Sequence, residues 1–250
     1  MPYDGSTMRP ALFGGTRVAL FGGTFDPPHR GHIALARLAR KRLSLDRILV
    51  APVAAQPLKR HAHPASFSDR VAMARLAFAR QPGIEISLID APRPDGSSNY
   101  TLDTLAELSR QLQPSDELFC ILGADSLLGI RNWHRPDDLL LACDFIVGAR
   151  PGFDLAQVRA ALPETIAAVP VTSDLPHTQV LELSRDPDPS HAAVRPSSRL
   201  YLLTDLAENA SATAIRAHIH AALRGNAQPH SVLAPAVAAY IRTHHLYQHL

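Results

Sequence analysis

Short apolar runs alternate along the chain with longer stretches in which apolar residues recur every three or four positions. The short runs are typical of buried strands, and the longer stretches are typical of amphipathic helices that cover a sheet. Strands that alternate with helices in this way predict βαβ units and a parallel sheet. The strands predicted from the pattern are 17–21, 47–52, 84–89, 117–123 and 143–150.

Helices are predicted between these strands, over residues 29–43, 68–81 and 101–112. In the last of them, the leucines at 102, 105, 108 and 112 would share one face. Proline falls mainly in the connections, where it separates one element from the next. We therefore predict an α/β fold, a doubly wound and mainly parallel sheet of the Rossmann-like type.

The C-terminal part of the chain follows a different pattern. Residues 178–184 and 199–204 look like two strands on either side of a polar loop over 184–198, which we expect to be mobile. After them, residues 211–223 and 235–245 look like two closing helices, with Pro235 suited to the first helical turn. The fold is therefore expected to end in a helical segment.

Length and composition limit the class of protein. With 250 residues, of which 46% are hydrophobic, the chain is long enough to bury a sizeable core. We interpret residues 1–15 as a mobile polar extension and residues 16–250 as a single domain, because no break in composition separates a second one. The oligomeric state is left open by the sequence.

Charge and cysteine content narrow the partners and the compartment. Lysine and arginine total 25 against 23 acidic residues, a balance that predicts neither nucleic-acid nor membrane binding. The first residues of the chain contain no apolar run of the length of a signal peptide core, and no apolar run in the sequence approaches the length of a membrane span. Cys120 and Cys143 both lie in apolar runs, so we expect buried, reduced thiols. These features favour the cytoplasm.

The tetrapeptide FGGT occurs twice, at 13–16 and at 21–24, and only the second copy has the context of a phosphate-binding loop. Such a loop follows a strand and precedes a helix, so that backbone N–H groups and the helix dipole converge on an anion. Gly22 and Gly23 permit close approach of a ligand to the backbone, and Thr24 and Phe25 complete the loop.

Two histidines, His29 and His32, follow this loop at the start of the predicted helix. By itself such a pair is usually a surface or a core feature, and no third and fourth ligand of suitable spacing suggests zinc. Together with the loop, however, the stretch GGTFDPPHRGH (22–32) resembles the signature of the nucleotidylyltransferase superfamily, whose short form is HxGH. That resemblance implies transfer of a nucleotidyl group, with Mg²⁺ bound through the phosphates of ATP.

The order of motifs from Arg17 to Tyr247 is similar to that of the bacterial nicotinate-nucleotide adenylyltransferase family. The family transfers the adenylyl group of ATP to nicotinate mononucleotide, giving deamido-NAD and pyrophosphate in NAD biosynthesis. The matching stretches are APVAAQPLK (51–59), SDRVAMARLAF (68–78), NYTLDTLAEL (99–108), ILGADSLLGIRNWHRPDDLL (121–140), VGARPG (147–152), SATAIR (211–216) and PAVAAYIRTHHLY (235–247).

The resemblance assigns expected roles to particular residues. His29, His32 and Arg216 would be catalytic, and Thr101, Trp133 and Arg150 would bind the mononucleotide, with Trp133 stacked on the nicotinate ring. From the residues alone, Thr101 could instead cap a helix, and Trp133 could simply pack. The ATP-binding residues would be Gly22, Gly23, Thr24, Phe25, Lys59, Gly123, Asp125, Ser211 and Thr213. Asp125 would bind the ribose or cap a helix. Ser211 and Thr213 would bind phosphates.

The chain departs from the family pattern at a few positions. His134 replaces a tyrosine, residues 56–58 read Gln-Pro-Leu where the family has Pro-Pro-His, and Ala210 replaces an isoleucine. The alternatives in the same class are a cytidylyltransferase, a phosphopantetheine adenylyltransferase, and an enzyme that prefers nicotinamide mononucleotide. The alternative outside the enzymes is a nucleotide-binding module without turnover. Such a module would need neither the catalytic histidines nor Arg216, so their presence argues against it.

Overall fold

The structure is a computed structural model that describes residues 15–54, 65–149, 152–185, 197–206, 212–223 and 232–248. The extension expected at residues 1–15 falls outside this range except for its last residue. The loop expected over 184–198 lies largely outside it as well, so both expectations stay predictions.

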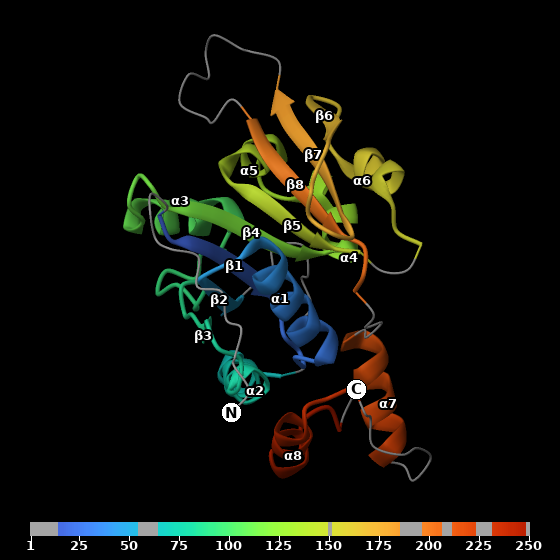
Figure 1. Ribbon diagram of the computed structural model, residues 1–250. Helices are drawn as coiled ribbons and strands as arrows, with labels where there is room; N and C mark the ends of the chain where they lie inside the picture. The colour runs from blue at the N-terminus through green and yellow to red at the C-terminus, as the bar shows by residue number, and fades with distance from the viewer. Residues whose placement is uncertain are drawn as a thin grey trace, which may run out of the picture.

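Eight strands within the described residues form one sheet, in the order β3-β2-β1-β4-β5-β8-β7-β6. The first six are parallel to one another, and β7 and β6 add an antiparallel hairpin at the far edge (Figure 1). The strands are β1 (Arg17–Gly23), β2 (Arg47–Pro52), β3 (Ile84–Ile86), β4 (Glu117–Gly123), β5 (Asp144–Gly148), β6 (Ile166–Val171), β7 (Thr178–Arg185) and β8 (Ser197–Leu203).

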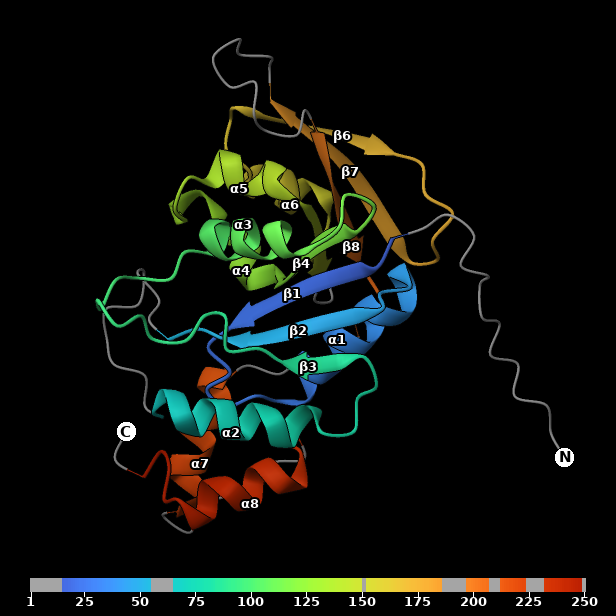
Figure 2. The ribbon, with the colours of Figure 1, turned by 90° about the vertical axis from the view of Figure 1, so that its left-hand side faces the viewer.

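Helices pack on both faces of this sheet. The core on one face includes residues of α1, α2, α7 and α8, and the core on the other face includes residues of α3 to α6. Figures 1 and 2 both place α8 near α2, and both place α7 and α8 away from the β6–β7 hairpin. The helices are α1 (Arg30–Leu43), α2 (Phe67–Phe78), α3 (Thr101–Gln111), α4 (Ala124–Leu128), the 3₁₀ helix η1 (Ile130–Asn132), α5 (Pro136–Ala142), α6 (Leu155–Ala161), α7 (Ala212–Leu223) and α8 (Pro235–Thr243).

The alternation within a strand explains how one sheet serves two cores. In β1, Val18 and Leu20 face the core that includes α3, whereas Ala19 and Phe21 face the core that includes α1. A strand covered on both faces is a continuous apolar run, as the sequence of β1 shows. The doubly wound α/β fold predicted from the sequence is therefore confirmed.

The parts of the fold that sequence analysis did not predict are short elements. Helices α4, α5 and α6 have five to seven residues, too few for a clear three- or four-residue period. Strand β6 is an edge strand that contains Pro170 and exposes Val169, so its pattern is not that of a buried strand. The predicted strand at 84–89 is shorter in the structure, where β3 ends at Ile86.

Several expectations about single residues are confirmed. Leu105 and Leu108 are buried on α3, with Leu102 and Leu112 packed beside them, and Pro235 occupies the first turn of α8. Cys120 and Cys143 are buried and form no disulfide. In the described part of the chain, no helix has both the length and the apolar character needed to cross a membrane.

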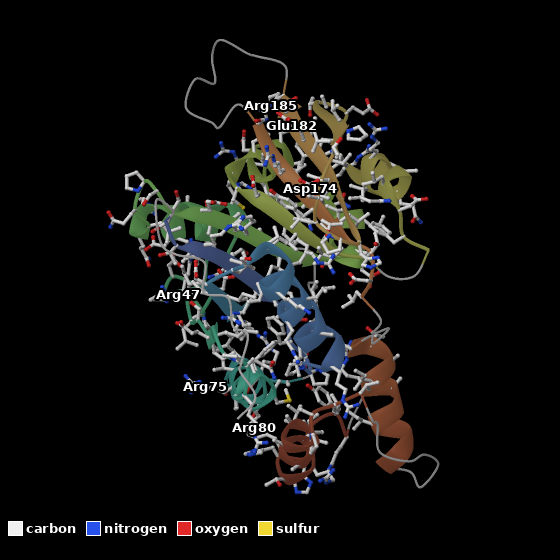
Figure 3. The ribbon with its side chains drawn as sticks, in the orientation of Figure 1. Arg47, Arg75, Arg80, Asp174, Glu182 and Arg185 are labelled. Atoms are coloured by element: carbon white, nitrogen blue, oxygen red, sulfur yellow. The ribbon has the colours of Figure 1, made fainter. Side chains whose placement is uncertain are left out.

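Charged pairs join the β6–β7 hairpin to helix α5. Arg185, at the end of β7 (Figure 3), lies 3.3 Å from a carboxylate oxygen of Asp137 and 3.3 Å from one of Asp138, both in the first turn of α5. The negative charges also favour that helix N-terminus. The hairpin is thus attached to a helix that packs on the parallel part of the sheet.

Candidate active site

The candidate site lies where the strand order reverses. β1 pairs with β2 on one side and with β4 on the other, so the chain leaves the carboxyl ends of β1 and β4 in opposite directions. Open α/β sheets bind their ligands in the crevice at such a switch point. Gly23 ends β1 and Gly123 ends β4, and an ideal Cβ at Gly123 would meet no atom within 4 Å. Both glycine segments expected from the sequence therefore meet at one edge.

The two histidines are stacked at the start of α1. His29 is the N-cap residue and His32 lies in the first turn, and their ring centroids are 3.7 Å apart with an interplanar angle of 28°. Phe25 packs its ring edge against His32, with centroids 5.0 Å apart. The pair thus occupies the junction between the glycine loop and the helix, with the apolar side chain of Phe25 holding one ring from the side.

A backbone hydrogen bond determines which nitrogen of His32 can act as a donor. The N–H of His29 donates to Nδ1 of His32 over 3.1 Å, so Nδ1 is the unprotonated nitrogen. The neutral ring then carries its proton on Nε2, which is left to donate to a ligand. Burial lowers the pKa of His32 well below its ordinary value of 6.5, and the charge of His29 lowers this pKa further. The geometry therefore favours a neutral donor.

The lowered pKa of His32 has a consequence for stability. Because the unfolded chain binds a proton at this histidine near pH 6.5 and the folded chain does not, the free energy of unfolding should fall as the pH drops below that value. The slope reaches at most about 1.4 kcal/mol per pH unit for one group. In urea unfolding between about pH 7 and about pH 5, His32→Gln should lose less stability than wild type. Equal losses in both proteins would contradict a neutral His32 in the folded chain.

Arg216 reaches the glycine loop from the other end of the chain. Its Nη1 donates to the carbonyl oxygen of Asp26 over 2.8 Å, across 190 residues of sequence, and its Nη2 donates to Oγ1 of Thr213 over 3.3 Å. Asp26 lies three residues before His29. A second link joins the same regions, since the N–H of Arg30 donates to the carbonyl of Val232 over 2.8 Å. Arg216 and the histidine pair are therefore brought to one loop.

Arg70, a buried arginine that the sequence analysis did not select, donates a hydrogen bond to the backbone of the glycine loop. Arg70 of α2 is 1% exposed, and it donates to the carbonyl oxygens of Thr24, Val53 and Ala54 at 2.8, 2.7 and 3.3 Å. These carbonyls belong to the segments that follow β1 and β2. One guanidinium thus ties together the two loops at the carboxyl edge of the sheet.

The expected mononucleotide residues lie on adjoining segments. The rings of Tyr100 and His134 are stacked with centroids 4.2 Å apart, which joins the start of α3 to the segment after η1. Thr101 and Trp133 are the neighbours of these two rings in sequence. Trp133 is partly buried and packs against the core, and part of its side chain remains exposed.

Neither Thr101 nor Asp125 is a helix cap, which was the alternative role open to each of them. Tyr100, not Thr101, is the N-cap residue of α3, and no described side chain caps that helix through a hydrogen bond. Gly123 is the N-cap residue of α4, so Asp125 lies in the first turn, where it is exposed. Both side chains thus lie in a first helical turn.

Some expected site residues lie outside the described residues, namely Lys59, Arg150 and Ser211. The departures from the family at 56–58 and at Ala210 lie outside them as well. His134, the third departure, is described, and its stacking on Tyr100 shows that an imidazole fits where the family has a tyrosine.

Comparison with known proteins identifies relatives over almost the whole chain. The family model described as cytidylyltransferase-like matches residues 20–218. A protein of Laribacter hongkongensis, named nicotinate-nucleotide adenylyltransferase, is 37% identical over 92% of this chain and 94% of its own length. One of Gloeobacter violaceus with the same name is 46% identical over 62% of this chain and 75% of its own length.

Solved structures agree with the fold. The nicotinic acid mononucleotide adenylyltransferase of Plasmodium falciparum, solved with NaAD, has a TM-score of 0.60 at 18% sequence identity and covers 93% of this chain and 97% of its own. At that identity the likeness supports the fold alone, whereas the relatives at higher identity define the family. The chain belongs to the nicotinate-nucleotide adenylyltransferases, within the cytidylyltransferase-like family.

Proposed function

We propose that this chain transfers the adenylyl group of ATP to nicotinate mononucleotide, giving nicotinate adenine dinucleotide and pyrophosphate, as a cytoplasmic step of NAD biosynthesis. Its family membership supports the reaction, which is that of the named relatives. The observation that carries the assignment of residues is the hydrogen bond from Arg216 to the carbonyl of Asp26, three residues before His29. This hydrogen bond joins α7 to the loop that leads to the histidine pair at the start of α1.

The chemistry requires positioning and charge neutralisation more than a covalent nucleophile. An oxygen of the mononucleotide phosphate attacks the α-phosphorus of ATP, the new P–O bond forms, and the bond to the leaving pyrophosphate breaks. In our proposal Nε2–H of His32 donates to a nonbridging oxygen of the α-phosphate as negative charge grows there. His29 supports that ring, and Arg216 neutralises the departing pyrophosphate, with Thr213 and Ser211 beside it.

The binding residues are proposed by the same resemblance. The backbone of Gly22, Gly23, Thr24 and Phe25 lies at the end of β1, where a triphosphate would approach the start of α1. Asp125 would bind the ribose beside Gly123. Lys59 is proposed to contact the phosphates of ATP, and Arg150 is proposed to contact the mononucleotide.

Magnesium would enter bound to the phosphates of ATP. It would supply positive charge to the triphosphate, and the residues named above would orient the phosphates around it. Among the described residues, no group of three or more histidine, cysteine, aspartate or glutamate side chains is placed to hold a metal ion.

The start of α3 supports a carboxylate-bearing substrate. The side chain of Tyr100, the N-cap residue, makes no cap hydrogen bond, so it does not occupy the N–H groups of the first turn. A helix N-terminus favours negative charge, which nicotinate carries and nicotinamide does not. Thr101 begins this turn, and the Tyr100–His134 stack holds the segment of Trp133 next to it.

Trp133→Ala should act on the mononucleotide and not on ATP. Loss of the ring face should raise the KM for nicotinate mononucleotide about tenfold, while the KM for ATP changes less than about twofold. Steady-state kinetics with each substrate varied in turn measures both. Trp133→Phe is the matched control, because it keeps an aromatic face and should lose less. An effect confined to ATP would show that the ring belongs to the other subsite.

The function itself is tested by pyrophosphate release. The purified chain is supplied with ATP and Mg²⁺ together with nicotinate mononucleotide, nicotinamide mononucleotide or phosphopantetheine, and separately with CTP in place of ATP. We expect release with ATP and nicotinate mononucleotide, and slower release with the nicotinamide compound. If phosphopantetheine were the only acceptor that gave release, or if release required CTP in place of ATP, the substrate assignment would be overturned. Nucleotide binding without any release would favour a binding module.

A further inference from the structure

We propose that Tyr247, near the C-terminal end of the chain, is a positioning residue that holds the catalytic loop in its active shape through Asp26. This inference rests on the proposed adenylyl transfer. The phenol oxygen of Tyr247 donates to Oδ1 of Asp26 over 2.6 Å, although the two residues are 221 positions apart. Asp26 in turn precedes His29 by three residues.

Asp26 is the point at which two separate restraints meet. Its side chain accepts from Tyr247, and its backbone carbonyl accepts from Arg216. A shift of Asp26 would therefore move both the helix start that carries His29 and the anchor of the Arg216 guanidinium. Positioning of reacting groups is sensitive to displacements of about 1 Å, so a restraint at this residue bears on the rate.

Both partners are buried, so the contact does not compete with water. Asp26 is 1% exposed and Tyr247 is 4% exposed, and the ring of Tyr247 lies in the same core as Phe25 and Met73. Hydrogen bonds from a hydroxyl to a buried carboxylate are short and strong, because no solvent replaces them. The 2.6 Å distance agrees with this class.

The backbone near each partner is in an unusual conformation. Tyr247 has a φ of 65°, and Phe25, next to Asp26, has a φ of 48°. Non-glycine residues adopt this left-handed region only where the surrounding contacts determine it. The turn after α8 and the turn before α1 are thus both shaped to bring the phenol and the carboxylate together.

The charge environment keeps the phenol protonated. Burial raises the pKa of Tyr247, the Asp26 carboxylate raises it further, and Arg216 and Arg70 act in the opposite direction. The net direction is upward, so Tyr247 remains a hydrogen-bond donor at neutral and mildly alkaline pH. The Tyr247 hydroxyl therefore keeps the proton that it donates to Asp26.

The test compares two tyrosine variants of the full chain. Tyr247→Phe removes the hydroxyl and keeps the ring in the core. Tyr240→Phe is the matched control, since the Tyr240 hydroxyl also donates to an aspartate, Oδ1 of Asp69 over 3.0 Å, but its acceptor lies on α2. Three quantities are measured for each, namely kcat and KM, thermal unfolding, and amide hydrogen exchange of a peptide covering residues 22–32.

We expect Tyr247→Phe to lower kcat about tenfold, with the KM for either substrate within about twofold of wild type, and to speed exchange in the loop peptide. Both variants should lower the unfolding temperature by about a few degrees. Tyr240→Phe should change neither kcat nor exchange in the loop peptide. Wild-type kcat and loop exchange in Tyr247→Phe, with only a lower unfolding temperature, would overturn the positioning role. Wild type that releases no pyrophosphate would overturn the proposed reaction instead, and the exchange comparison would still decide whether Tyr247 holds the loop.

Discussion

Replacement of His32 with alanine is expected to lower kcat about 100-fold, while the dissociation constant for ATP changes less than about threefold. The reason is that Nδ1 of His32 is occupied by the N–H of His29, which leaves Nε2–H as a fixed donor. A fixed donor of this kind contributes most where charge develops in the transition state and little in the ground state. Single-turnover rates and equilibrium binding of ATP separate the two effects.

His244→Ala is the control for this experiment. His244 is an exposed histidine at the end of α8, where its ring stacks on Tyr240, and it should be replaced without loss of turnover. His32→Gln should retain part of the rate, because its amide nitrogen can donate near the position of Nε2. Unchanged turnover in His32→Ala would remove this histidine from the mechanism.

Arg70→Met is expected to lower the free energy of unfolding by about 3 kcal/mol. Methionine fills a similar space but leaves the carbonyl oxygens of Thr24, Val53 and Ala54 without their shared donor. Each buried acceptor without a partner costs about 1–3 kcal/mol, and the loops can recover part of this by shifting. Because the Thr24 loop leads directly to Asp26 and His29, kcat should fall as well. Urea unfolding and steady-state kinetics measure the two losses.

Arg75→Met provides the matched control on the same helix. Arg75 is exposed (Figure 3), so its replacement should change the free energy of unfolding by less than about 0.5 kcal/mol. Equal destabilisation by the two variants would show that the hydrogen bonds from Arg70 to the three carbonyls do not contribute to the free energy of unfolding.

The sequence predicted most of the fold because the central strands are clear apolar runs and the long helices have a clear period. β1, β2 and β4 are continuous apolar runs covered on both faces, and α3 places its leucines on one face. β6 and the short helices were not predicted, because tertiary packing and not a local period determines them. Edge strands and short helices are generally not predicted from the hydrophobic pattern alone.

The candidate site divides in a similar way. The loop and histidine pair could be predicted because their residues are contiguous, from Gly22 to His32. Arg70 and Tyr247 could not, since each acts from a distant element, and an arginine within a helix is more often exposed than buried. The one available indication was the position of Arg70 directly before the apolar residues of α2, where a charged side chain needs buried partners.

The central claim is that the histidine pair and Arg216 border the same triphosphate. A crystal structure with a non-hydrolysable ATP analogue and Mg²⁺ tests it most directly. We predict that phosphate oxygens lie within about 3.5 Å of Nε2 of His32 and of the Arg216 guanidinium. A triphosphate bound away from α1, or one that contacts His32 while Arg216 faces another surface, would contradict the account.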